Sequence, residues 1–220
     1  MVVPHAGYIY SGPIAGLAYR VLTQMSPSPE RVVLLGPCHQ VPVQGLALPK
    51  SSSFATPLGQ TPVDQQAYKE LARLPFVEVN EEAHAYEHSL EVQLPFLQST
   101  LASFSLLPLV VGHASSEIIC QALDGVVNKN TLIVVSTDLS HYLPYDLACH
   151  IDRETIKAIL EGNRELIVSE RACGAYPLKG LMSFAQKKGW TARLLDLRNS
   201  GDTAGDKKQV VGYGAVVYHE

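Results

Sequence analysis

Three apolar, β-branched runs of this 220-residue chain stop abruptly at a histidine, at His5, His39 and His141. Runs of Val, Ile and Leu bounded by Gly and Pro are typical of strands buried on both faces, as in a parallel sheet covered by helices. Ligands of such sheets bind just outside the carboxyl ends of the strands. If the three strands are near neighbours, their imidazoles converge on one crevice and form a metal or proton-transfer site. Taken singly, a histidine after a strand is more often a hydrogen-bonded loop or core residue than a ligand.

A carboxylate precedes the third histidine by three residues, in the segment Ser-Thr-Asp-Leu-Ser-His that contains Asp138 and His141. An aspartate beside a histidine can fix its tautomer, raise its basicity or join it at a metal ion. The alternative for Asp138 is a helix or turn cap, which the same residue type also favours.

A second cluster of histidines, His-Ala-Tyr-Glu-His, contains His84, Glu87 and His88. The cluster matches the H-x-x-E-H signature of inverted zinc peptidases, in which two imidazoles lie one helical turn apart beside a glutamate. Pro95 interrupts the helix that such an enzyme needs. The alternative is a helix N-terminus, where Glu87 meets the positive end of the helix dipole.

One cysteine of the four, Cys173, precedes a predicted helix directly. Backbone N–H groups and the helix dipole stabilise a thiolate at such a junction, which makes Cys173 a better ligand or nucleophile than a buried thiol. Cys38, Cys120 and Cys149 form no C-x-x-C pair, so neither a zinc ribbon nor a thioredoxin motif is present, and they suit small buried positions.

Strand-like and helix-like segments alternate along the chain, which predicts an α/β fold: one layered domain with a mostly parallel central sheet covered by helices. We expect residues 49–62 to be a surface connection and residues 199–208 a mobile loop. The predicted strands are 31–36, 44–48, 76–79, 106–112, 131–136, 191–197 and 209–219, and the predicted helices are 14–25, 63–74, 87–101, 116–127, 146–160 and 174–188.

Composition excludes several classes of function. The formal charge of −4 and the lack of a basic tract argue against nucleic-acid binding and against attraction to an anionic membrane. The apolar stretches are shorter than the roughly 20 residues that span a bilayer, and the first residues lack the charged segment followed by a hydrophobic one that is typical of a signal peptide. We therefore expect a soluble cytoplasmic protein that forms a single domain over residues 1–220.

The ordered motifs resemble those of the Memo family, also called AmmeMemoRadiSam system protein B, over nearly the whole chain. The family is similar in fold to class III extradiol dioxygenases, which hold non-haem iron with two histidines and a glutamate. The motifs that carry the resemblance are Pro4-His5-Ala6-Gly7-Tyr8, Gly36-Pro37-Cys38-His39, Glu87-His88-Ser89 with Glu91 and Leu94-Pro95, Ser136-Thr137-Asp138 with His141, Cys173-Gly174 with Pro177, and Tyr213-Gly214-Ala215.

The resemblance implies a divalent or redox metal ion, with iron first and copper or zinc as the alternatives, since a thiolate ligand favours softer ions. It also implies an AMMECR1-like protein and a radical SAM protein as partners. By the same resemblance the metal ligands are His5, His39 and Cys173, and the catalytic residues of the pocket are His141, Asp138 and His88.

The chain departs from the family at two points. Cys38 stands where the family usually has a small hydroxyl residue, and it either adds a second thiol near the metal or fills space. The chain also begins almost at the first histidine motif, whereas relatives carry an additional N-terminal segment, so we expect an incomplete first strand.

Three functions remain open. The leading hypothesis is metal-dependent oxidation of a small aromatic or redox-active substrate, with His141 as acid or base. The second is a non-catalytic module that binds a peptide or protein in the same crevice, because tyrosines suited to recognition lie beside the histidine motifs. The third is a zinc peptidase that uses His84, Glu87 and His88. The tyrosines are Tyr8, Tyr10, Tyr86 and Tyr142.

Overall fold

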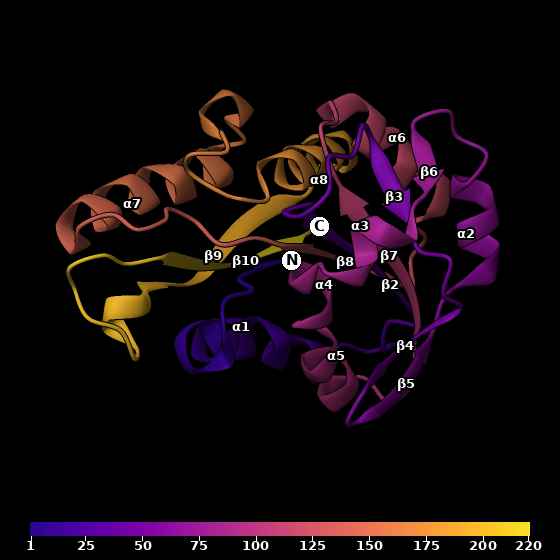
Figure 1. Ribbon diagram of the computed structural model, residues 1–220, viewed down its shortest axis with the longest axis horizontal. Helices are drawn as coiled ribbons and strands as arrows, with labels where there is room; N and C mark the ends of the chain where they lie inside the picture. The colour runs from indigo at the N-terminus through magenta and orange to yellow at the C-terminus, as the bar shows by residue number, and fades with distance from the viewer.

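The computed structural model describes all 220 residues and places eight strands in one sheet between two layers of helices (Figure 1). The order across the sheet is β6-β3-β7-β2-β8-β1-β10-β9. Neighbours are parallel within β6-β3 and within β7-β2-β8-β1, and the remaining pairs are antiparallel. The predicted α/β fold with a mostly parallel sheet is therefore confirmed. The strands are β1 (Val2–Val3), β2 (Arg31–Pro37), β3 (Leu46–Leu48), β6 (Val77–Val79), β7 (Ser105–Val111), β8 (Thr131–Ser136), β9 (Thr191–Asn199) and β10 (Gly212–His219).

The three strands that lead to the histidines lie side by side. β2 pairs in parallel with β8, and β8 pairs in parallel with β1, so that Val135 is the register partner of both Leu35 and Val2. Their carboxyl ends consequently meet at one edge of the sheet. The expectation that these strands are near neighbours is confirmed, and the edge they share is where the site must be sought.

Alternation of side chains divides the core into two layers. Along β2, Val32 and Leu34 point to one face and Val33 and Leu35 to the other, as the two-residue period of a strand requires. The first face is covered by α1 (Tyr8–Leu22), α3 (Glu81–Ala85), α4 (His88–Glu91) and α5 (Leu94–Thr100), and the second by α2 (Gln65–Leu71), α6 (Ser116–Val126), α7 (Tyr145–Glu161) and α8 (Ala175–Lys188). Figure 1 shows α1 and α5 on the opposite side of the sheet from α6, α7 and α8.

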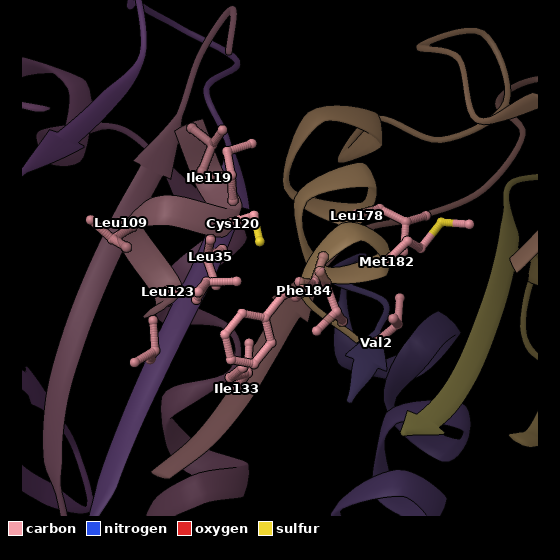
Figure 2. Close-up of a cluster of buried hydrophobic side chains, with 14 of the residues drawn as sticks. Val2, Leu35, Leu109, Ile119, Cys120, Leu123, Ile133, Leu178, Met182 and Phe184 are labelled. Carbon is pink, nitrogen blue, oxygen red and sulfur yellow. The ribbon is translucent and has the colours of Figure 1, made fainter. Parts of the chain in front are cut away.

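The second layer brings α8 close to α6 and to the sheet (Figure 2). Phe184 of α8 is fully buried beside the apolar side chains of β2, β7 and β8, and burial of such a ring stabilises the fold by about 1.5–3 kcal/mol. Gly180 permits the approach, because a Cβ there would overlap the side chain of Ile119 of α6. This packing fixes where α8 begins, at Ala175, with its N-cap Gly174 directly after Cys173.

Several element boundaries differ from the sequence-based expectations. Residues 49–62 contain a hairpin of β4 (Ser53–Thr56), which is mostly half-buried, and β5 (Gly59–Pro62), which is mostly exposed. Both strands are short and lack the apolar pattern of the central sheet. Helix α1 begins at Tyr8 instead of residue 14, so Pro13 lies inside it, where its missing N–H leaves a carbonyl without its helical partner. The predicted helix 87–101 is divided into α4 and α5, because Pro95, in the first turn of α5, has no backbone N–H with which to continue α4. No helix is long and apolar enough to cross a membrane.

Candidate metal centre

The imidazoles of His5, His39 and His88 meet at the carboxyl ends of β1 and β2. One potential ligand atom from each ring lies within 4.8 Å of the other two, and the ring centroids are 5.1–5.4 Å apart. His5 is buried at 2% exposure, whereas His39 and His88 are exposed. The three rings thus form a bowl with a buried floor and an open mouth, a geometry that suits a metal ion.

A buried carboxylate fixes the backbone at His5. Asp138 Oδ1 accepts hydrogen bonds from the backbone N–H groups of His5, at 2.8 Å, and of Ala6, at 3.3 Å. Burial raises the pKa of Asp138 to about 6, against the opposing effect of these hydrogen bonds. Asp138 Oδ2 lies 4.0 Å from His5 Nε2. Asp138 therefore joins β1 to the loop after β8 and remains mostly ionised at neutral pH.

Glu87 fixes the second imidazole. It is the N-cap of α4 and accepts a hydrogen bond from the backbone N–H of Ser89 at 3.0 Å. It also accepts hydrogen bonds from the backbone N–H of His39, at 2.7 Å, and from His39 Nδ1, at 2.9 Å. Burial alone would raise the pKa of Glu87, but these hydrogen bonds lower it to about 2. Because a carboxylate can only accept, His39 carries its hydrogen on Nδ1 and its Nε2 is left for the site.

The start of α4 rests directly on the end of β2. A Cβ at Gly36 would lie 2.5 Å from Ser89 Oγ and 2.8 Å from Leu90 Cδ2, so only glycine leaves room for the helix. Ser89 Oγ also donates to the carbonyl of Pro37 at 3.1 Å. This close approach positions both His88, which α4 carries, and Glu87, which orients His39.

Cys173 borders the same bowl. Its Sγ lies 3.4 Å from His5 Nε2 and accepts a hydrogen bond from the backbone N–H of Asp138 at 3.3 Å. Burial raises the pKa of Cys173, but the neighbouring imidazoles of His39 and His5 outweigh this effect and bring the value to about 6. Hydrogen bonds to Cys173 and Glu87 raise the pKa of His39 to about 10. At neutral pH the site therefore contains a thiolate paired with an imidazolium.

The remaining predicted residues lie at the periphery. His141 is half-buried, forms no hydrogen bond or ion pair, and packs its ring against Tyr142 at a centroid distance of 6.0 Å. His84 lies on α3 and its Nε2 is 2.9 Å from the carbonyl of Ala47. Because α3 ends at Ala85, before Glu87 and His88, the two histidines of the peptidase signature do not share a helix face.

A groove of about 710 Å³ opens beside the bowl, where Ala6 and Gly7 follow His5. Tyr10, Tyr142 and Tyr213 are among its lining residues. Tyr142 is 68% exposed and has φ of +55°, a left-handed conformation that is uncommon for a bulky residue. Backbone strain of this kind is concentrated at functional sites.

Sequence patterns located the histidines but missed what orients them. The pattern identified Glu87 as a helix start, which it is, yet gave no signal that its carboxylate holds His39, 48 residues away. Two further polar residues support the site. Ser136 Oγ lies 3.0 Å from His5 Nδ1, and Gln93 Nε2 lies 2.8 Å from Ser136 Oγ. Only the pairing of β1 with β8 and the packing of α5 bring these residues together.

Comparisons with known proteins agree with the resemblance found in the sequence. The model of the Memo-like protein family matches residues 1–217. A MEMO1 family protein of Metallosphaera sedula is 36% identical over 100% of this chain and 82% of its own length, and one of Ignicoccus hospitalis is 39% identical over 99% and 81%. An uncharacterized protein of Escherichia coli K12, JW3007, has a similar fold, with a TM-score of 0.63, 14% identity and coverage of 96% and 97% of the two chains.

Proposed function

Because this chain belongs to the Memo-like protein family, whose motifs surround the histidine bowl, we propose that it binds a metal ion there through His5 and His39. The observation that carries the proposal is the convergence of three imidazoles within 4.8 Å at the carboxyl ends of parallel strands. The anchoring of His39 by Glu87 supports it, since metal-binding histidines usually donate their other ring N–H to a carboxylate, a carbonyl or water.

Two side chains compete for the third ligand position. His88 completes a set of three imidazoles, which suits iron, copper and zinc, whereas Cys173 adds a thiolate, which favours copper(I) and zinc. We propose iron first, with copper or zinc as alternatives. A cation that binds His39 Nε2 must displace a proton, because the pKa of His39 is about 10.

The bound metal would supply Lewis-acid or redox chemistry at the mouth of the bowl. We propose that the reaction is oxidation of a small aromatic or redox-active substrate lying in the adjacent groove. Asp138, buried and with a pKa raised to about 6, can hold or release a proton 4.0 Å from His5 Nε2. His141, near Tyr142 at the groove, is the second candidate for proton transfer.

Metal analysis of protein purified without an affinity tag tests the metal site. We expect His5→Ala and His39→Ala each to lower the bound iron, copper or zinc at least about tenfold. His88→Ala and Cys173→Ser, measured separately, identify the third ligand as the one whose loss lowers metal content. His150→Ala is the control, because this histidine is exposed on α7. Unchanged metal content in both His5→Ala and His39→Ala would contradict the proposal.

Oxygen uptake tests the proposed reaction independently of binding. Protein reconstituted with Fe(II) is supplied with a panel of catechols, and we expect uptake that is lost in His39→Ala. Binding of iron without uptake for any member of the panel would retain the metal site and refute this oxidation chemistry.

The tyrosine-lined groove favours a second function, the binding of a peptide or partner protein without catalysis. The observation that favours it is Tyr142, whose side chain is exposed and whose backbone is strained. Exposure to solvent does not by itself explain this strain, whereas a role in binding does. Here we expect Tyr10→Ala and Tyr142→Ala to abolish retention of a bound peptide from a library, while His39→Ala leaves it intact. Equal retention in all three variants would exclude the groove as the binding surface.

A further inference from the structure

A chain of buried polar side chains runs from α1 to the floor of the bowl. Tyr19 is 1% exposed, Gln93 and Ser136 are 0% exposed, and His5 is 2% exposed. Tyr19 Oη lies 3.0 Å from Gln93 Oε1, Gln93 Nε2 lies 2.8 Å from Ser136 Oγ, and Ser136 Oγ lies 3.0 Å from His5 Nδ1. Buried polar groups without partners are costly, so the direction of each hydrogen bond in such a chain is constrained.

The first link has one solution. The Gln93 side chain contacts the backbone carbonyl of Pro4 at 2.9 Å, and a carbonyl can only accept a hydrogen bond. The amide nitrogen must therefore be the atom that faces Pro4, and it directs its second hydrogen to Ser136 Oγ. The amide oxygen is then the acceptor for the Tyr19 hydroxyl, which agrees with the observed contact.

The second link follows from the first. Ser136 Oγ lies 2.6 Å from the backbone carbonyl of Ser89, which again can only accept, so the single hydroxyl hydrogen of Ser136 points there. One lone pair of the hydroxyl accepts from Gln93 Nε2. The remaining lone pair faces His5 Nδ1, which must therefore be the donor.

We propose that Ser136 and Gln93 are positioning residues that keep a hydrogen on Nδ1 of His5 and leave Nε2 as the atom that works in the site. Nε2 faces Cys173 Sγ at 3.4 Å and Asp138 Oδ2 at 4.0 Å, so it is the nitrogen directed toward the bowl. The hydrogen stays on Nδ1 whether the ring is neutral or protonated. The location of this hydrogen needs no metal, and only its effect on metal affinity rests on the proposed function.

The ¹⁵N chemical shifts of ¹⁵N-histidine-labelled protein show which ring nitrogen of His5 carries the hydrogen. The His5 signals are assigned by their loss in His5→Gln. At a pH where the ring is neutral, we expect Nδ1 of the unmutated protein to give the shift of a protonated nitrogen and Nε2 that of an unprotonated one. In Ser136→Ala the acceptor is gone, so we expect the Nε2–H tautomer to appear and metal affinity to fall about 10- to 100-fold.

Thr155→Val is the matched control, because it removes an equally buried hydroxyl from α7 and should change neither readout. A neutral His5 with its hydrogen on Nε2 in the unmutated protein would overturn the proposal, and this measurement requires no variant other than the one used for assignment. An unchanged tautomer in folded Ser136→Ala would overturn it as well. If Ser136→Ala changes the tautomer of His5 as expected but the unmutated protein binds no metal, this inference stands and the proposed function is refuted.

Discussion

Replacement of Gly36 by alanine tests whether the seating of α4 on β2 holds the bowl together. The added Cβ would lie 2.5 Å from Ser89 Oγ and 2.8 Å from Leu90 Cδ2. Non-bonded heavy atoms normally sit about 3.5–4.0 Å apart, so α4 or the end of β2 must move by roughly 1 Å. Overpacking of this kind costs about 1–3 kcal/mol of folding free energy.

The same displacement should disturb all three imidazoles. α4 carries His88, its N-cap Glu87 holds His39, and the carbonyl of Ser89 receives the hydroxyl hydrogen of Ser136 beneath His5. Ligand sites lose function when their geometry shifts by about 1 Å. We therefore expect Gly36→Ala to weaken metal binding at least about tenfold in addition to lowering the stability.

Urea unfolding and metal titration measure the two effects separately. Gly16→Ala is the matched control, because a Cβ at this position of α1 meets nothing within 4 Å, and alanine in a helix is favoured over glycine by about 1 kcal/mol. Gly16→Ala should keep the metal affinity and retain or raise the stability. Metal affinity unchanged by Gly36→Ala would refute the argument that the contact of α4 with β2 positions the ligands.

Three further predictions concern charge. Glu87→Gln should lower the pKa of His39 from about 10, as followed by NMR titration, because the amide loses the charge that stabilises the imidazolium. Between about pH 6 and 10, metal affinity measured by titration calorimetry should rise about tenfold per pH unit, since binding displaces the one proton that His39 holds beside the Cys173 thiolate. Burial alone would raise the pKa of Asp64, but hydrogen bonds from the N-terminus of α2 and from Arg31 lower it. The ionised Asp64 therefore stabilises the fold at pH values above the pKa it has in the unfolded chain, and this stabilisation is lost as the pH falls through its pKa in the folded protein. Asp64→Asn should flatten this acid limb in urea unfolding at a series of pH values.

The sequence predicted the parts of the site that depend on local pattern. Apolar runs that end at His5 and His39 were enough to expect an edge of parallel strands, because burial on both faces leaves a continuous hydrophobic signal. Cys173 came from the resemblance to the Memo family and from its place before a helix. The hairpin of β4 and β5 was not predicted, because its two short strands lack the runs of apolar residues that mark the strands of the central sheet.

The contacts that orient the rings could not be predicted, because they join residues far apart in the chain. Ser136 is 131 residues from His5, and Gln93 is 43 residues from Ser136. In the sequence both are ordinary polar residues next to apolar runs. Their role depends on sheet order, which places β8 beside β1, and on the helix break at Pro95, which starts α5 beside Gln93.

The charges around the bowl decide which kind of ligand it can attract. Glu87, Cys173 and Asp138 have pKa values of about 2, 6 and 6 and are wholly or mostly ionised at neutral pH. The imidazolium of His39 offsets one of these negative charges. Buried charge of one sign is costly unless it is compensated, so the bowl favours a cation and disfavours an anion. An anionic substrate group would therefore have to lie in the groove, whose lining includes Lys208 beside Asp206, with the reacting part of the substrate directed toward the proposed metal ion.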